Sequence, residues 1–242
     1  MRTLVISDIH ANLPALEAVL QDAGMVDAVW CLGDLIGYGP YPNECIDKVR
    51  GLPNLICLLG NHDAAALGQI DVEAFNLEAK LSVVWMKAEL TEASLGFLSH
   101  LPDRVTTHNV TLTHGSPRNP VWEYILDTRT ATTNFRYFST PYCFIGHTHL
   151  PTVYTLSAAH EMANVSMPGT ERVLNLDTRT ILNPGSVGQP RDHDPRSSYA
   201  IYETELESWE YHRVEYDIAS VQARILEVGL PARHAQRLAE GW

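Results

Sequence analysis

The chain has 242 residues, of which 45% are hydrophobic, and a formal net charge of −12. This length and composition allow one sizeable core, so we expect a single domain over residues 1–242. The acidic charge argues against nucleic acid and against an anionic membrane as partners, because both recruit basic patches.

Neither a membrane span nor a secretory leader is apparent. No window approaches the roughly 18 uninterrupted apolar residues of a spanning helix, and no charged region with a long apolar stretch precedes the run Leu4–Ile6. The four cysteines show no CxxC spacing: they are Cys31, Cys45, Cys57 and Cys143. We therefore expect free thiols and a cytoplasmic location.

Short apolar runs that end in glycine or a polar residue recur in the first two thirds of the chain and predict strands. These runs cover residues 3–7, 28–32, 54–59, 110–113 and 141–145. After the first run, Leu13, Leu16, Ala18 and Leu20 indicate an amphipathic helix, with Pro14 suited to its first turn. Strands that alternate with helices predict an α/β fold with much parallel pairing.

Residues 72–101 are typical of an outer helical layer. Apolar residues recur there at helical spacing: they are Phe75, Leu81, Val84, Trp85, Leu90, Leu95 and Leu98. We expect two helices with a break near residues 91–93, ended by Pro102. A lid over the site is the alternative, because lids tend to be insertions of this length.

After Pro151 the pattern changes to short runs separated by turn residues, which favours antiparallel strands. The candidates cover residues 152–156, 172–176, 198–202 and 209–214. The tail at 218–238 returns to helical spacing.

Polar side chains that bind metals follow most of the predicted parallel strands. They are Asp8, His10, Asp34, Asn61, His114, His147 and His149. Ligands of open α/β sheets bind beyond the carboxyl ends of the strands, so these side chains should converge. In Asp8-Ile9-His10 and in His147-Thr148-His149, an extended chain would point the outer pair the same way.

The residue types indicate which metals would bind. Carboxylates, imidazoles and an amide oxygen without thiolate suit Mn²⁺, Fe or Zn²⁺. Two carboxylates facing two divalent cations leave a positive surplus, which would attract a phosphate to this acidic chain.

Five motifs occur in a fixed order between residues 8 and 149. They are Asp8-x-His10, Gly33-Asp34, Gly60-Asn61-His62-Asp63, His114-Gly115 and Gly146-His147-Thr148-His149. In this order they resemble the calcineurin-like metallophosphoesterase family. The resemblance implies a four-layer α/β/β/α sandwich with two packed mixed sheets and the site at the carboxyl ends of the strands.

The resemblance also implies two divalent cations, Mn²⁺ first, with Fe or Zn²⁺ as alternatives. The first metal would be held by Asp8, His10, Asp34 and His149. The second would be held by Asp34, Asn61, His114 and His147, with Asp34 bridging.

By the same resemblance, His62 is the catalytic histidine, which protonates the leaving oxygen or stabilises its charge. Asp63 is expected to orient His62 and to raise its basicity. In two-metal chemistry a bridging hydroxide attacks phosphorus in line with the leaving group.

Three turn-rich segments are candidates for substrate contacts. Residues 37–44, 116–124 and 183–192 look like those of bacterial diadenosine tetraphosphatase-like phosphodiesterases. The expected substrate-binding residues are Asn12, Tyr38, Arg118, Trp122 and Arg191. Arginines can fork onto phosphate oxygens and aromatic rings can stack a base. The alternatives are ion pairs with Glu123 or Asp192, and ordinary packing for the rings.

The expected reaction is hydrolysis of a dinucleoside polyphosphate or a related nucleotide phosphodiester, so the partner is a small anionic phosphate ester. A phosphoserine or phosphothreonine protein phosphatase would share the metal centre. A binding scaffold or nucleotide sensor, as in the related retromer subunit, would have lost ligands, and none is missing here. The sequence gives no indication of the oligomeric state.

Overall fold

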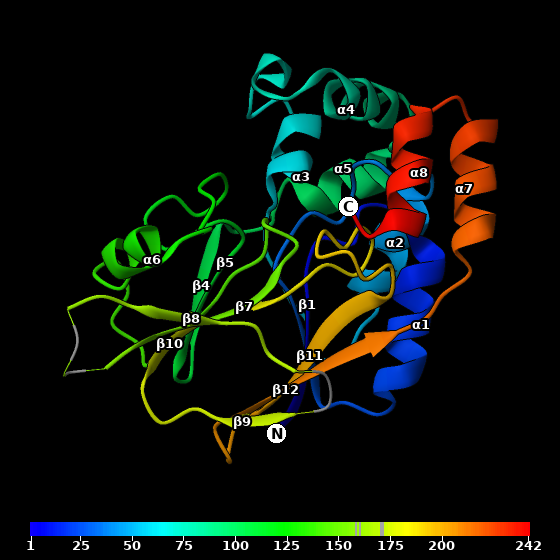
Figure 1. The fold of residues 1–242 in the computed structure, drawn as a ribbon. Coiled ribbons are helices and arrows are strands. Elements are labelled where there is room, and N and C mark those ends of the chain that lie inside the picture. The colour runs from blue at the N-terminus through cyan, green and yellow to red at the C-terminus, as the bar shows by residue number, and fades with distance from the viewer. Residues whose placement is uncertain (158, 160, 170–171) are drawn as a thin grey trace.

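Two six-stranded mixed sheets pack face to face, with helices on the outer side of each (Figure 1). The computed structural model describes residues 1–157, 159, 161–169 and 172–242. The first sheet has the order β3-β2-β1-β11-β12-β9. Its strands are β1 (Arg2–Ile6), β2 (Ala28–Cys31), β3 (Ile56–Cys57), β9 (Val173–Asn175), β11 (Ser197–Glu203) and β12 (Ser208–Val214).

The second sheet has the order β4-β5-β6-β10-β7-β8. Its strands are β4 (Arg104–Thr107), β5 (Val110–Thr113), β6 (Tyr142–Phe144), β7 (Pro151–Leu156), β8 (Asn164–Ser166) and β10 (Arg179–Pro184). In each sheet three neighbouring strands are parallel, namely β1, β2 and β3 in the first and β5, β6 and β10 in the second. Their carboxyl ends form the edge that carries the site.

Helices cover the outer faces and this edge. They are α1 (Leu13–Ala23), α2 (Pro42–Arg50), α3 (Asn61–Ala66), the 3-10 turn η1 (Val72–Ala74), α4 (Leu77–Glu89), α5 (Glu92–Leu98), α6 (Thr128–Asn134), α7 (Ile218–Glu227) and α8 (Ala232–Glu240). In Figure 1, α1 and α2 lie outside the first sheet, α6 lies on the second, and α8 runs beside α4.

Strand alternation builds the core. In β1, Val5 points between the sheets, whereas Leu4 and Ile6 pack toward α1 and α2. In β6, Phe144 points between the sheets and Cys143 packs toward α6. Side chains alternate between the two faces of a strand. Each sheet therefore contributes to an inner core between the two sheets and to an outer core between that sheet and its helices. The expected α/β/β/α sandwich is therefore confirmed.

Most expected elements are present, and the differences lie where the periodic signal is weak. Strands β4, β8 and β10 and helices α2, α3 and α6 were not expected. The tail forms two helices rather than one, because the turn at Gly229 (φ 77°) and the following Pro231 end α7. The break between α4 and α5 is confirmed, and both pack as an outer layer; movement of this segment as a lid stays a prediction.

All four cysteines are free and buried, as expected. Among the described residues, no helix is long and apolar enough to cross a membrane.

Candidate metal centre

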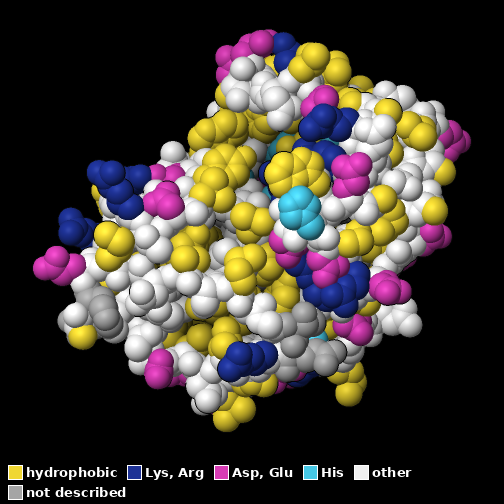
Figure 2. All heavy atoms as spheres, in the orientation of Figure 1, with side chains coloured by type: hydrophobic (Ala, Val, Ile, Leu, Met, Phe, Trp, Pro, Cys, Tyr) yellow, Lys and Arg dark blue, Asp and Glu magenta, His cyan; other side chains and the backbone are white. Residues whose placement is uncertain are grey.

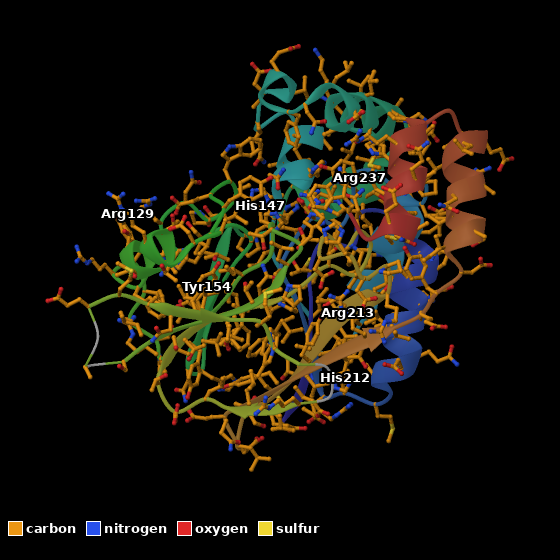
Figure 3. The ribbon with its side chains drawn as sticks, viewed as in Figure 1. Arg129, His147, Tyr154, His212, Arg213 and Arg237 are labelled. Carbon is orange, nitrogen blue, oxygen red and sulfur yellow. The ribbon has the colours of Figure 1, made fainter. Side chains whose placement is uncertain are left out.

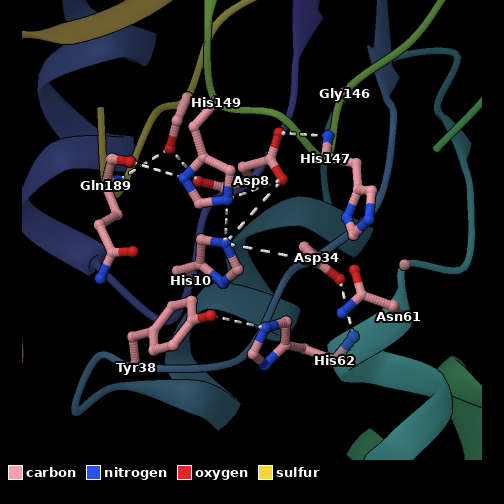
Figure 4. Close-up of polar contacts among 12 residues, drawn as sticks. Asp8, His10, Asp34, Tyr38, Asn61, His62, Gly146, His147, His149 and Gln189 are labelled. Atoms are coloured by element: carbon pink, nitrogen blue, oxygen red, sulfur yellow. Dashed lines mark hydrogen bonds and ion pairs between the residues drawn. The ribbon is translucent and has the colours of Figure 1, made fainter. Parts of the chain in front are cut away.

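The seven expected ligands converge at the carboxyl ends of the parallel strands, and Figure 4 labels all of them except His114. Each side chain is at most 3% exposed. Asp8 and His10 follow β1, Asp34 follows β2, Asn61 begins α3 after β3, His114 follows β5, and His147 and His149 follow β6. Segments that are far apart in the sequence thus supply one buried polar cluster.

The backbone at these positions is left-handed rather than extended. Asp8, His10, Asp34, His147 and His149 have φ values of 54°, 50°, 54°, 64° and 61°. Such values are uncommon for residues other than glycine and concentrate at functional sites. The expectation that an extended chain aligns each pair is therefore wrong, because β1 and β6 end before the pairs begin, although the side chains still converge.

Two glycines allow the loops to approach closely. A Cβ on Gly60 would lie 2.1 Å from Asp34 Oδ1, and a Cβ on Gly146 would lie 1.9 Å from Ser7 Oγ. Only a residue without a side chain fits at these two contacts. The glycines of the two motifs are therefore required for packing around the site.

The first half of the centre consists of Asp8, His10 and His149, and the lone pairs of its two imidazoles face one another. His10 Nδ1 donates to Ile36 O at 3.0 Å, and His149 Nδ1 donates to Gln189 O at 2.6 Å. Burial lowers the pKa of both imidazoles well below the usual range, so both rings are neutral. Their unprotonated Nε2 atoms then lie 3.0 Å apart.

Asp8 completes this half. Its Oδ1 lies 3.4 Å from His149 Nε2 and 3.9 Å from His10 Nε2. Within the described chain this buried oxygen has no hydrogen-bond partner. Acceptors that face one another without a donor fit a shared cation, and the ligand atoms of the three residues lie within 4.8 Å of one another.

The second half has the same character. His114 Nδ1 donates to Leu32 O at 2.9 Å, and its Nε2 lies 3.0 Å from Asn61 Oδ1 and 3.4 Å from Asp34 Oδ2. His147 Nε2 donates to the main-chain oxygen of Trp122 at 3.1 Å, which leaves Nδ1 free to bind a metal. Asp34, His114 and His147 form a second group with metal-ligand geometry.

Asp34 joins the two halves. Its Oδ2 also lies 3.7 Å from His10 Nε2, and Figure 4 shows it between the two sets of ligands. Burial alone would raise the pKa of Asp34, but the nearby His114 and His62 hold it well below its usual range. For His114, burial opposes charge, yet the Asp34 carboxylate raises the pKa to about 9. A proton or a metal can therefore occupy the place between these two residues, and metal binding would release the proton.

His62 lies against Asp34, but not against the side chain of Asp63. The His62 amide donates to Asp34 Oδ1 at 2.9 Å, and its ring Nε2 lies 3.1 Å from the Tyr38 hydroxyl. His62 Nδ1 is buried with no partner among the described residues. Burial lowers the pKa of His62 to about 4, so the ring is neutral near pH 7.

We expected Asp63 to contact and orient His62, but the structure gives the Asp63 carboxylate other partners. The Asp63 carboxylate accepts instead from the main-chain amides of Leu35, Ile36 and Gly60, at 3.3, 3.2 and 3.0 Å. Its oxygens are used by these amides, so it fixes the loop after Asp34 against α3. Burial, with the charge of Asp34, raises its pKa to about 7.

Two of the residues expected to contact substrate, Asn12 and Tyr38, make contacts within the chain. Asn12 caps α1 by accepting from Ala15 N at 3.2 Å, and it donates to Gly188 O at 2.9 Å, so its amide holds two loops together. Tyr38 is only 8% exposed, and its ring lies 4.7, 4.6 and 4.9 Å from the rings of His10, His62 and His234. Tyr38 therefore has no free face for a base.

The two candidate arginines differ. Arg118 is exposed and pairs with Glu123, which is the alternative that the sequence left open. Arg191 does not pair with its neighbour Asp192, which binds Arg213 instead. Its Nη2 donates to Gln189 Oε1 at 3.1 Å. In the described chain, its buried Nε has no partner.

Aromatic side chains line the site on the side of His147. The Trp122 ring lies 5.1 Å from Phe75, which contacts the edge of His62 at 5.0 Å. Tyr124 stacks on His147 at 3.8 Å with an interplanar angle of 24° and keeps 45% of its surface exposed. Tyr124 therefore offers an aromatic surface beside the cluster.

Three neighbours of the site were not expected from the sequence. Phe75 comes from the helical segment, and His234 and Arg237 come from α8; Figure 3 labels Arg237. The tail showed only helical spacing, with no motif around its histidine or arginines. Their proximity to Tyr38 depends on how α8 packs, which local sequence does not encode.

Comparisons with known proteins agree with this geometry. A sequence profile described as the calcineurin-like phosphoesterase superfamily domain matches residues 1–207. An uncharacterised protein of Methanocaldococcus jannaschii is 36% identical over 241 residues, which cover 97% of this chain and 96% of that protein. The crystal structure of a metallophosphoesterase from Sphaerobacter thermophilus is 48% identical, with a TM-score of 0.92, over 100% of this chain and 99% of that chain.

A shorter match concerns a named activity. The symmetrical bis(5'-nucleosyl)-tetraphosphatase of Pseudomonas fluorescens is 34% identical over 67 residues, which are 26% of this chain and 23% of that enzyme.

Proposed function

The chain belongs to the calcineurin-like phosphoesterase superfamily of metal-dependent phosphoesterases, and we propose that it hydrolyses a dinucleoside polyphosphate or a related nucleotide phosphodiester. The observation that carries the proposal is the pair of Nε2 lone pairs of His10 and His149, which face one another at 3.0 Å beside Asp8 Oδ1. A divalent cation suits such a set of acceptors.

Two metals would share the cluster. The first would be held by Asp8, His10, Asp34 and His149. The second would be held by Asp34, Asn61, His114 and His147. When bound, such cations polarise phosphate and lower the pKa of water, which supplies the nucleophile. We propose Mn²⁺, with Fe or Zn²⁺ as alternatives, because the donors are oxygen and nitrogen without thiolate.

The chain itself would stabilise the negative charge that develops on the leaving oxygen, through a hydrogen bond from His62. Burial raises the pKa of the Tyr38 hydroxyl, so it keeps its proton and can donate to His62 Nε2. The ring proton of neutral His62 then resides on Nδ1, the ring nitrogen without another partner in the described chain. Tyr38 is thus a positioning residue, and His62 Nδ1–H is available to the leaving oxygen.

Several features favour a nucleotide over the alternatives. Tyr124 and Trp122 offer aromatic surface beside His147, where a base could stack. The partial match to a tetraphosphatase points the same way. A non-catalytic scaffold is disfavoured because every expected ligand and His62 are retained in one cluster.

One experiment separates the candidate activities. Metal-free protein would be reloaded with Mn²⁺ and incubated with diadenosine tetraphosphate, bis-p-nitrophenyl phosphate and a phosphopeptide, and the products would be separated by chromatography. Two ADP would indicate symmetric cleavage, and ATP plus AMP would indicate asymmetric cleavage. Turnover of the phosphopeptide alone would contradict the proposal in favour of a phosphoprotein phosphatase. No turnover with Mn²⁺, Fe²⁺ or Zn²⁺ would favour a scaffold.

A further inference from the structure

Arg191 and Arg237 are among the arginines of the described chain that form no ion pair with a side-chain carboxylate. Seven arginines of the described chain form an ion pair with a side-chain carboxylate: they are Arg2, Arg50, Arg118, Arg196, Arg213, Arg224 and Arg233. Arg191 donates to the neutral Gln189 side chain, and Arg237 donates through Nε to the main-chain oxygen of Trp242, the last residue of the sequence.

Arg191 is tied directly to the metal centre. The main-chain oxygen of Gln189 accepts from the ring of His149, and its side chain holds Arg191. The Arg191 guanidinium lies 5.8 Å from the centroid of the Tyr38 ring, whose hydroxyl contacts His62.

Helix α8 brings Arg237 to the same place. His234, one turn earlier on α8, packs its ring 4.9 Å from Tyr38 and bonds to Glu78 O at 3.2 Å. Residues three apart share a face of a helix, so Arg237 lies on the face that meets Tyr38 and Arg191. Burial and the charge of Arg191 lower the pKa of Arg237. Figure 2 shows Lys or Arg side chains on the face of the molecule that carries the C-terminus.

Two like charges in a partly buried place are costly unless an anion compensates them. The chain carries 29 acidic residues against 17 basic ones, so carboxylates are abundant. Even so, no side-chain carboxylate of the described residues forms an ion pair with either arginine. Guanidinium groups bind phosphate through paired N–H donors. Arg191, which is connected to His149 through Gln189, lies beside the metal centre and is placed to meet an anionic group joined to the phosphate that reacts there.

We propose that Arg191 and Arg237 together bind a second phosphate of the substrate, next to the phosphate at the metal centre. This subsite rests on the proposed function and deepens it, because it selects a polyphosphate chain over a simple monoester. Helix α8 is then a specificity element, which a phosphoesterase for isolated phosphate groups would not need.

The test compares two ligands that differ by one phosphate. ADP and AMP would be titrated calorimetrically into the Mn²⁺-loaded protein at a fixed free Mn²⁺ concentration. The unmodified protein should bind ADP at least about 10-fold more tightly than AMP, the scale of charge-assisted hydrogen bonds. Arg237→Gln should bring this ratio close to one, and Arg237→Lys should restore part of it.

The matched control is Arg233→Gln, which removes an exposed arginine of the same helix that pairs with Glu78. It should keep the ADP preference of the unmodified protein, and thermal unfolding would check that each variant is folded. Equal affinities for ADP and AMP in the unmodified protein, or a preference that survives Arg237→Gln, would overturn the subsite.

Hydrolysis of bis-p-nitrophenyl phosphate, which has a single phosphate, is measured on the unmodified protein alongside. Its absence would count against the proposed function, whereas the ratio of ADP to AMP affinity decides the subsite independently.

Discussion

Replacing Tyr38 with phenylalanine tests whether the protein positions its catalytic histidine through a tyrosine. The hydroxyl lies 3.1 Å from His62 Nε2, and His62 is 4% exposed, so water cannot readily replace it. The ring would remain between His10, His62 and His234, and no expected metal ligand would lose a hydrogen bond. The change therefore isolates one contact.

The size of the effect follows from the burial of that contact. A buried polar atom left without its partner costs about 1–3 kcal/mol. If the loss of this contact misorients His62 and destabilises the transition state by that free energy, kcat should fall by roughly 5- to 150-fold. Metal content should stay the same, because the hydroxyl hydrogen-bonds to no expected metal ligand.

The assay measures kcat and KM for bis-p-nitrophenyl phosphate, metal content by elemental analysis, and the ring tautomer of His62 by ¹⁵N NMR. Tyr199→Phe is the matched control, since it removes a buried hydroxyl that bonds to Asp22 and packs against the outer core. It should cost stability and leave kcat unchanged. An unchanged kcat and tautomer in Tyr38→Phe would refute the positioning role, and loss of metal would assign the hydroxyl to the centre instead.

Four further changes test the site and its surroundings. His62→Ala should lower kcat by roughly 10²-fold or more with both metals retained, the usual scale for a lost hydrogen-bond donor to developing charge; loss of metal on elemental analysis would make it a ligand. Asp34→Asn should reduce occupancy at both metal positions, and unchanged occupancy would speak against bridging. Gly60→Ala should destabilise by about 1–3 kcal/mol in urea unfolding, because its Cβ would meet Asp34 at 2.1 Å, whereas Gly96→Ala, with open space, should not. Burial lowers the pKa of His234 to about 4, so the unfolded chain takes up a proton first as pH falls below about 6.5. His234 should then contribute about 2 kcal/mol to the stability that the metal-free protein loses by pH 5, and His234→Gln should remove that contribution; equal slopes would contradict it.

The sequence alone determined the fold class and the members of the polar cluster. Short apolar runs ending in Asp8, Asp34 or His114 carry two signals at once, a buried strand and a polar residue at its carboxyl end. Because parallel strands bring these ends to one edge, residues from distant segments could be expected to meet. Local pattern was sufficient here because the sheet converts position along the chain into position in space.

Only the tertiary structure decided which groups contact His62 and the space around it. Asp63 is its neighbour in sequence but binds backbone amides, whereas Tyr38, 24 residues away, supplies the hydrogen bond. Asn12 is used as a helix cap, and α8 adds His234 and Arg237 from the far end of the chain. These outcomes depend on left-handed turns at the strand ends and on helix packing. Both are set by the summed contacts of distant segments, so no local spacing could reveal them.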